Sequence, residues 1–429
     1  MNNEKDTSLP CGPYAALRYR DCRLLLASAV LAVISGKMQL VVLGFELYRR
    51  TGQAMSLGWL ALALGLPMLI LGLFAGQVSD WFNRKRILMF CQLLSMCTSL
   101  ALVVIVVRQD SVEWIYLCVL LRGIFGTFGR PARQALLPQM VPTSVFPNAV
   151  TWGSSSVQLA MVLGPALGGW IVASNNWIMP GGQELSSVAV ALLIDAVFLI
   201  MAFLLVALIA TRPVEPSKDP ASFKSLLAGF RFVWNTKLIL ATITLDLFAV
   251  LLGGASYLFP IYAQDILHVG AKGLGWMEAA PAIGAICMAI LLAHLPPLQR
   301  AGRTMLLAVV GFGVATIGFG FSTTYPLSLL MLFFAGAFDT ISVIVRHTLV
   351  QTLSPENMRG RISAVNSMFI GASNEMGGVE SAVAANFFGP VVAVVSGGVG
   401  TILVVIAAAA IWPQIRRIGS LHNLKSNHR

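Results

Sequence analysis

Eight charged side chains lie well inside the long apolar runs of this sequence, away from the ends of the runs. They are two bases and six acids: Lys37, Arg122, Asp195, Asp246, Glu278, Asp339, Glu375 and Glu380. A charge at the centre of a membrane helix costs about 2.5–3.5 kcal/mol on insertion scales, so such residues face a cavity or one another. Because there are only two bases, at least four acids lack a basic partner. An acid of this kind in a low-dielectric site takes up a proton readily, which is the chemistry of a proton pathway.

Position along the runs separates these charges by depth. A helix rises 1.5 Å per residue, so position along a run gives depth in the membrane. Five of these residues fall near the middle of their runs: Lys37, Arg122, Asp246, Asp339 and Glu375. Asp195 and Glu278 are expected nearer the outer face. Neutral polar residues extend the hydrogen-bonding surface, and they are Gln39, Gln158, Asn366 and Asn374. A cavity with Lys37 and Arg122 could attract an anionic or catecholate substrate. Alternatively, Asp339 and Arg346, seven residues apart on one helical face, belong to a charge network with no part in transport.

The composition shows which elements must position these residues. Of 429 residues, 57% are hydrophobic and only 11% are charged, and the mean hydropathy is +0.80. A soluble protein of this length needs far more charge to cover its surface. The hydrophobic residues come in continuous runs of about 20, the length of a membrane-spanning helix, without the alternation of a barrel strand. The sequence therefore predicts an all-α membrane protein that spans the bilayer many times.

Twelve candidate spans can be counted. They are 24–48, 55–76, 87–107, 112–132, 148–173, 187–211, 238–262, 271–293, 304–323, 326–350, 363–387 and 389–412. The predicted organisation is a cytoplasmic N-terminal segment (1–23), a six-helix half (24–211), a linker (212–237), a second six-helix half (238–412) and a cytoplasmic tail (413–429). In the linker, residues 222–234 carry apolar side chains at helical spacing, which indicates an amphipathic helix on the membrane surface.

Lysine and arginine in the loops predict the orientation. With both termini in the cytoplasm, 23 of the 29 basic residues fall on the cytoplasmic side, Arg346 among them, and 4 on the other. This asymmetry also explains the net charge of +11 without a nucleic-acid partner. The chain is expected to be a multi-pass protein of the cell inner (plasma) membrane.

Three pairs of segments repeat in order at nearly constant offset. "CRLLLASAVL" from Cys22 matches "TKLILATITL" from Thr236, and "GWLALA" from Gly58 matches "GWMEAA" from Gly275. "RQALLPQMVP" from Arg133 likewise matches "RHTLVQTLSP" from Arg346. The sequence therefore predicts two parallel six-helix pseudo-repeats around a central cavity, as in transporters with two halves.

Short motifs resemble the major facilitator superfamily. The loop after the second span, "GQVSDWFNRKRIL", has Gly76, Asp80, Arg84 and Lys85 where that superfamily has G-x-x-x-D-x-x-G-R-[RK], with Asn83 in place of the second glycine. Asn tolerates a left-handed backbone better than most residues, so the turn is expected to survive. "RGIFG" matches R-x-x-x-G at Arg122 and Gly126. "GPALGG" matches the end of the antiporter pattern at Gly164, Pro165, Gly168 and Gly169, although Thr151 and Ala160 replace upstream glycines.

The resemblance implies two roles for these motifs. Asp80 is expected to form a cytoplasmic gating latch with the start of the eleventh span near Ser363, together with Gly76, Arg84, Lys85, Arg130 and Arg133. The corresponding segment of the second half, "LPPLQRAGR", has Gln299 in place of the acid, so the latch is one-sided. The glycines of "GPALGG" let helices approach closely, and Pro165 favours a kink.

Longer segments are similar to one branch of the superfamily, the enterobactin exporter group, among them "RYRDCRLLLASAVL" and "GASNEMGGVES". The resemblance implies a secondary transporter, a proton-coupled exporter of a small organic molecule such as a siderophore, working by rocker-switch alternating access. Multidrug or macrolide efflux is the alternative. The remote alternative is an intramembrane enzyme or receptor, but there is no H-E-x-x-H, G-x-S-x-G or P-loop motif. The expected partners are a small-molecule substrate, protons and the lipid bilayer, without nucleic acid.

The remaining expectations concern cofactors and assembly. None of the six cysteines forms a C-x-x-C pair, so neither zinc nor a disulfide is expected, and no cofactor or metal is predicted. The protein is expected to be a monomer that could hand its substrate to an outer-membrane exit system.

Overall fold

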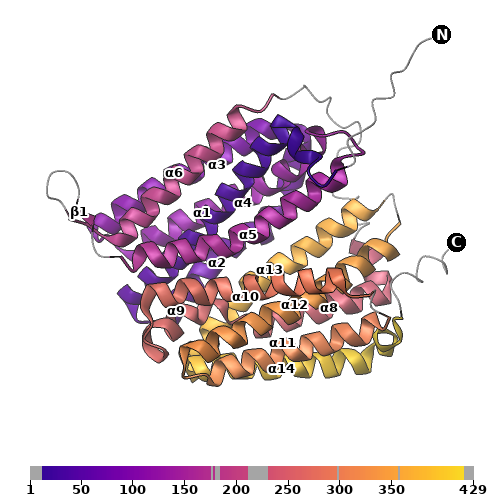
Figure 1. Cartoon of the computed structure of the whole chain (residues 1–429). Helices are drawn as coiled ribbons and strands as arrows, with labels where there is room; N and C mark the ends of the chain where they lie inside the picture. Colours follow the sequence, from indigo (N-terminus) through magenta and orange to yellow (C-terminus); the bar gives the residue numbers. More distant parts are fainter. Residues whose placement is uncertain are drawn as a thin grey trace, which may run out of the picture.

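The computed structural model describes residues 12–174, 177–178, 184–210, 230–296, 299–355 and 358–419. Apart from an antiparallel two-residue ribbon, β1 (Trp177–Ile178) with β2 (Glu184–Leu185), the regular structure in these ranges is helical. Figure 1 shows long helices running side by side in two groups, α1–α6 and α8–α14. The all-α membrane architecture predicted from the apolar runs is confirmed.

Each of the twelve expected spans has a helix. The first half holds α1 (Arg20–Thr51), α2 (Ala54–Trp81), α3 (Arg84–Arg108), α4 (Val112–Leu136), α5 (Phe146–Val172) and α6 (Ser187–Ala207). The second half holds α8 (Lys237–Gly253), η3 (Ala255–Leu258), α9 (Phe259–Ile261), η4 (Tyr262–Ile266), α10 (Gly270–His294), α11 (Ala301–Phe321), α12 (Tyr325–Leu353), α13 (Arg359–Phe388) and α14 (Pro390–Ile411). Two short 3₁₀ helices, η1 (Ala16–Arg18) and η5 (Pro413–Arg417), lie at the described ends, and η2 (Leu137–Gln139) follows α4.

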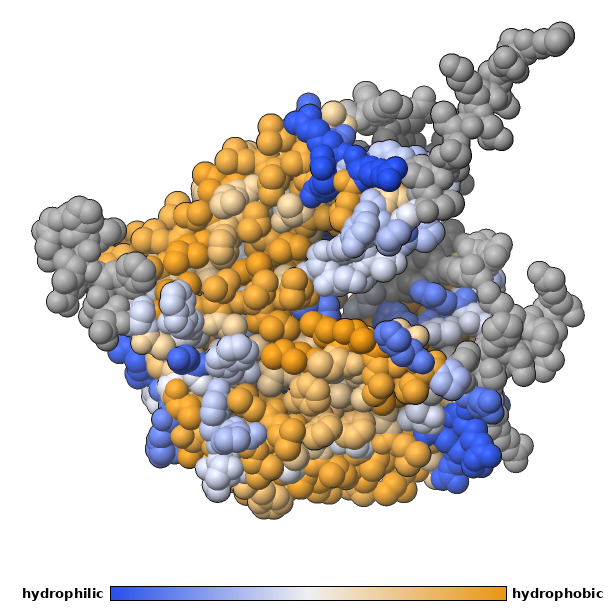
Figure 2. Space-filling view, viewed as in Figure 1, coloured by the Kyte–Doolittle hydropathy of each residue, from blue (hydrophilic) through white to orange (hydrophobic). Residues whose placement is uncertain are grey.

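Eleven membrane-length apolar segments are found in the described residues, and α13 is not among them. Arg359, Arg361, Glu375 and Glu380 make this helix more polar than the others. It nevertheless packs along both α2 and α8 inside the bundle. Figure 2 shows the consequence for the surface, a broad apolar band between polar side chains at the two ends of the helices.

Local sequence signals set several helix boundaries. The side chain of Ser186 caps α6 by accepting a hydrogen bond from the backbone N–H of Ala189. Gly52, whose φ of 63° is left-handed, is the C-cap that terminates α1. The side chain of Asn83 accepts a hydrogen bond from the N–H of Arg86 and caps α3. Its φ is −62°, so the expectation that Asn83 replaces glycine by adopting a left-handed backbone is wrong. A side-chain cap closes the turn here.

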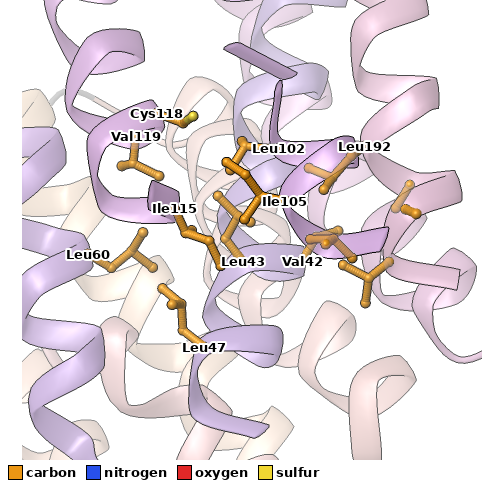
Figure 3. Close-up of a cluster of buried hydrophobic side chains, with 14 of the residues drawn as sticks. Val42, Leu43, Leu47, Leu60, Leu102, Ile105, Ile115, Cys118, Val119 and Leu192 are labelled. Atoms are coloured by element: carbon orange, nitrogen blue, oxygen red, sulfur yellow. The ribbon is translucent and has the colours of Figure 1, made fainter. Parts of the chain in front are cut away.

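The core of the first half is a layer of apolar side chains to which α1, α2, α3, α4, α5 and α6 all contribute. Figure 3 shows Leu43 and Leu47 of α1 beside Leu60 of α2, Leu102 of α3 and Ile115 of α4. Each of these five side chains is essentially inaccessible to solvent. Burial of such side chains holds the helices of this half together as one unit.

The contacts between helices follow the sequence repeat. In the first half α2 packs on α4, α4 on α3, α3 on α6, and α1 on both α5 and α6. The corresponding helices of the second half make the same set of contacts, α10 on α12, α12 on α11, α11 on α14, and α8 on both α13 and α14. Between the halves, α2 packs on α13 and α5 on α10. The helices of the two halves therefore pack in the same pattern, as the predicted repeat requires.

The two halves are joined tightly at one end. A buried cluster there combines Val41 and Tyr48 of α1 with Phe259, Tyr262 and Met277 of the second half. The other described clusters draw their buried residues from one half only. At the opposite end, where η1 and η5 lie, Figure 2 shows the surface recessed between the halves. We call these the closed side and the open side.

The predicted amphipathic helix at 222–234 falls mostly outside the described residues. Residues 230–235 are helical. There Val233 is buried in a cluster with Ile239, Val350 and Ile362, and Phe230 stacks on Phe369. In residues 230–235, one face of this helical segment therefore packs against other helices of the protein.

Candidate functional site

Charged and hydroxyl groups from both halves meet where the halves face each other. The hydroxyl of Tyr257, on η3, donates a hydrogen bond to the carboxylate of Glu375, on α13. Glu278 of α10 is close enough to act electrostatically on Tyr257. From the first half, Lys37 of α1 acts on both Glu278 and Glu375. We call Lys37, Tyr257, Glu278 and Glu375 the interface cluster.

All four side chains of the interface cluster are partly exposed although they lie deep in the bundle. Partial exposure lowers the cost of holding charged groups between apolar helices, because such groups need a partner or solvent. The arrangement can exchange a proton or hold a polar part of a small molecule.

Glycines allow the helices around the cluster to approach closely. A Cβ added to Gly65 of α2 would lie 2.8 Å from Cγ of Glu375. A Cβ at Gly378 of α13 would lie 2.7 Å from a ring carbon of Tyr257, and one at Gly164 of α5 would lie 2.8 Å from Cβ of Lys37. Any side chain at these positions would push the cluster apart.

Arg122 and Asp195 form an ion pair within the first half. Nη1 of Arg122 lies 2.8 Å from Oδ2 of Asp195, whose side chain is completely buried. Ser35 of α1 donates to the same carboxylate, as does Ser99 of α3. Arg122 donates to both hydroxyl oxygens, at 2.6 Å to Ser35 and 2.9 Å to Ser99. The charge of Arg122 is therefore balanced inside its own half, and Asp195 lies at the level of Arg122, deeper than the sequence suggests.

A second buried pair joins Asp246 of α8 to Arg346 of α12. The side chain of Arg346 is 2% exposed. Assigning Arg346 to a cytoplasmic loop is therefore wrong, because α12 continues to Leu353 and carries the guanidinium inside the bundle. Asp339, on the same helix, is partly buried and has no ion-pair partner among the described residues. The predicted network of Asp339 with Arg346 is replaced by the pair with Asp246.

The other predicted polar residues lie in different surroundings. Gln39 and Asn366 are buried, and within the described part of the chain Nε2 of Gln39 and Oδ1 of Asn366 have no hydrogen-bond partner. Asn374 is exposed and donates to the carbonyl of Ile370 on its own helix. Glu380 is partly exposed and accepts from Ser381 at 3.4 Å. These residues do not join the interface cluster through any described hydrogen bond.

Two basic residues at the start of α3 bind backbone carbonyls. Nη1 of Arg84 donates to Ala135 O of α4 at 3.2 Å, and Nζ of Lys85 donates to Ala207 O and Ile209 O at the end of α6, at 2.8 and 2.7 Å. Cations at helix C-termini stabilise the partial negative charge there. Lys85 thus has a structural role beyond membrane orientation.

The predicted latch itself is only partly within the described structure. The side chains of Asp80 and Ser363 lie outside the described residues, so their contact stays a prediction. Around Gly76 an added Cβ would meet no atom within 4 Å. Of the two arginines on α4, Arg130 is exposed and approaches Sδ of Met68 at 3.7 Å, while Arg133 is partly buried.

The glycines of "GPALGG" contact two different helices. Cβ atoms at Gly164 and Gly168 would lie 2.9 Å from Ile34 O and 3.0 Å from Met38 O, both on α1. A Cβ at Gly169 would lie 2.7 Å from Cα of Gly275, on α10 of the other half. Pro165 is buried between these contacts. The motif therefore packs α5 against its own half and against its partner half at once.

Several residues of these networks were not predicted from the sequence. Tyr257, Ser35 and Ser99 are neutral and sit within apolar runs, so no charge signal marks them. Glu46 was also missed. It is fully buried and pairs with Arg49 and Arg50, at 2.9 and 2.7 Å. Its spacing of three and four residues from two arginines is a recognisable helical ion-pair signal.

Comparison with known proteins decides the family. The model of the Major Facilitator Superfamily matches residues 25–378. The chain belongs to the Major Facilitator Superfamily. It is therefore a transporter and not an enzyme.

Two curated relatives are similar to this chain along most of its length, and one solved structure shares its fold. It is 28% identical over 373 residues to the multidrug efflux pump Tap of Mycobacterium tuberculosis (strain ATCC 25618 / H37Rv), covering 82% of this chain and 84% of Tap. It is 26% identical over 349 residues to the enterobactin exporter EntS of Citrobacter koseri, covering 80% of each. An inward-facing, occupied bacterial homologue of the human lysosomal transporter Spinster has a TM-score of 0.71 at 15% identity, covering 95% and 97%, which supports the fold alone. The resemblance predicted from the motifs is confirmed at the level of this superfamily.

Proposed function

We propose that the protein is a proton-coupled exporter of a small organic molecule in the inner membrane, working by alternating access. The interface cluster carries the proposal. Glu375 and Glu278 lie on the second half, Lys37 on the first, and Tyr257 is bonded to Glu375. Groups that bind across two halves change their surroundings when the halves rock, so proton binding and substrate binding can each favour one state.

The proposed orientation puts both termini and the open side in the cytoplasm. Residues on that side include Arg84, Lys85, Arg130 and Arg303, in line with the excess of basic residues in cytoplasmic loops. The structure is then open to the cytoplasm, the side from which an exporter takes its substrate. We also propose that one chain is the transport unit, because its own two halves complete the cluster.

Charge balance bears on the substrate. Of the two cations expected to attract an anionic substrate, Lys37 and Arg122, Arg122 is already paired with Asp195. Lys37 remains, and it acts on Glu375 together with Arg130. A siderophore, the substrate named for EntS, stays the first candidate on group resemblance. The two acids Glu278 and Glu375 thus balance the charges of Lys37 and Arg130. A site without excess positive charge favours a second candidate, a range of drug-like molecules held by apolar contacts. The relative named a multidrug efflux pump agrees with this candidate.

Reconstituted protein tests the coupling. In proteoliposomes with an imposed pH gradient, the wild type should move enterobactin or the lipophilic cation ethidium only while the gradient lasts. Glu375→Gln removes the titrating group but keeps a hydrogen-bond acceptor for Tyr257. We expect this variant to lose gradient-driven transport by at least about tenfold and to keep substrate exchange without a gradient.

Glu380→Gln is the matched control, since Glu380 lies five residues further on α13 and, among the described residues, accepts only from its neighbour Ser381. It should behave like the wild type. Gradient-driven transport that is normal in Glu375→Gln would remove the coupling role of the cluster. Transport of enterobactin but not ethidium would select the siderophore candidate, and the reverse would select the drug-like one.

A further inference from the structure

The closed side is sealed mainly by apolar packing. Val41 and Leu57 of the first half are buried against Leu258, Phe259 and Met277 of the second. Contacts of this kind are not directional, so they resist separation without fixing how the halves align. The alignment must come from directional contacts at the rim of this cluster.

In the described residues, two side-chain hydrogen bonds cross between the halves at that rim. The hydroxyl of Tyr48, near the end of α1, donates to the carboxylate of Asp265 on η4. One residue earlier on η4, Nε2 of Gln264 donates to the carbonyl of Phe45 at 3.3 Å. Tyr48 is buried, whereas Asp265 is exposed to solvent. The bonded pair thus lies at the border between the apolar seal and water.

The nearby cations of α1 do not compete for Asp265. Arg49 and Arg50 are both held by Glu46 of their own helix, and Arg50 also donates to the carbonyl of Asp110 at 3.1 Å. Within the described part of the chain, Asp265 is therefore left to the phenol hydroxyl of Tyr48. A single neutral donor binds a carboxylate less firmly than an ion pair, which suits a contact that must break in each cycle.

The segment that carries the acceptor has unusual backbone geometry. η4 is a π-helical turn, and Leu267 N–H donates to Tyr262 O at 2.8 Å. It is followed by His268, a non-glycine residue with a φ of 51°, and by Gly270 with a φ of 61°. Nδ1 of His268 lies 2.8 Å from Gln264 O, inside the same turn. π-turns and left-handed residues often mark segments that move or bind.

We infer that Tyr48 and Asp265 form a polar latch that holds the closed side shut, and that opening this side requires the latch to break. The inference rests on the proposed alternating access. It also identifies η4 as the segment that moves when this side opens, because the acceptor Asp265 lies on this short irregular segment between α8 and α10. Removing the hydroxyl of Tyr48 leaves the ring in the apolar seal and removes only the latch.

Hydrogen–deuterium exchange tests this on the intact protein in lipid nanodiscs, without substrate or a proton gradient. In Tyr48→Phe, amides of residues 41–52 and 258–269 should exchange about tenfold faster than in the wild type, the change expected for loss of one hydrogen bond to a charged group. Asp265→Ala should have a similar effect. The double variant should exchange no faster than the faster single one, because both remove the same contact.

Tyr262→Phe is the matched control, since the hydroxyl of Tyr262 donates to Gly320 O within the second half. It should leave residues 41–52 unchanged. Equal exchange in Tyr48→Phe and the wild type, or an equal increase in Tyr262→Phe at residues 41–52, would overturn the latch. Because no substrate is present, loss of the proposed proton coupling would not alter these results.

Discussion

Arg122 and Glu375 show how two charges in similar apolar runs can have different tasks. Arg122 donates to one carboxylate and two hydroxyls, and its partner Asp195 is completely buried. Glu375 is partly exposed and lies between the two halves. A fully satisfied buried pair rigidifies one half, whereas a partly solvated acid at a moving interface can gain and lose a proton.

This difference predicts the behaviour of the first pair. Arg122→Leu leaves the carboxylate of Asp195 buried without a cation, so we expect a loss of about 3–5 kcal/mol in stability. The double variant Arg122→Leu/Asp195→Leu removes both charges and should recover much of this loss. Thermal unfolding of the purified variants, followed by size-exclusion chromatography, measures both. If the double variant were no more stable than Arg122→Leu, the pair would not be the main contact of Asp195.

At the scale of the element, α5 and α10 owe their contact to glycine. Gly169 and Gly275 bring the two backbones together at the closed side, beside the apolar cluster that joins the halves. Small residues at a helix interface in a membrane increase van der Waals contact, because lipid supplies no hydrophobic drive between helices. The same close contact fixes which part of α5 can act as a pivot.

A single methyl group should disturb this contact. Gly169→Ala puts a Cβ 2.5 Å from Ala271 O and 2.7 Å from Cα of Gly275, so we expect a loss of about 1–3 kcal/mol from overpacking. Gly126→Ala is the control, because its Cβ meets no atom within 4 Å. Thermal unfolding compares the two. Equal stability of Gly169→Ala and Gly126→Ala would show that α5 and α10 can shift apart at little cost.

At the scale of the whole molecule, the described contacts between the halves are uneven. The one described core cluster that mixes both halves lies at the closed side, and the surface is recessed at the other (Figure 2). The proposed cytoplasmic latch at Asp80 acts at the open side, so its contacts are expected to form when this side closes. A two-state transporter needs contacts of comparable strength at both ends.

Asp80→Asn tests the proposed cytoplasmic latch. We expect the variant to insert normally, since acids contribute little to orientation, but to transport at least about tenfold more slowly because the state closed to the cytoplasm is weakened. Asp21→Asn is a control on the same side, because Asp21 accepts from the N–H of Ala210 within the first half. Vesicle transport assays with matched protein amounts compare the variants. Normal transport rates in Asp80→Asn would show that the segment around Asp80 is a charged turn without a gating role.

The prediction from sequence was best where one residue carries a strong local signal. Apolar runs predicted every span, and charge inside those runs marked Lys37, Glu278 and Glu375 of the interface cluster. Sequence-based prediction failed where the partner of a polar side chain comes from a distant helix. Nothing near Asp246 in the sequence points to Arg346, and Tyr257 carries no charge at all, because choice of partner depends on how helices pack and not on spacing along one helix.

The sequence by itself determined that this chain is a two-half helical membrane protein, because hydropathy, repeats and backbone hydrogen bonding in lipid leave few alternatives. Only the tertiary structure decided which charges are neutralised within a half, as in Arg122 with Asp195, and which face the other half, as in Lys37 with Glu375. The reason is physical. Burial in lipid requires each charge to find a partner or water, but the helix that supplies the partner is chosen by packing across the whole bundle.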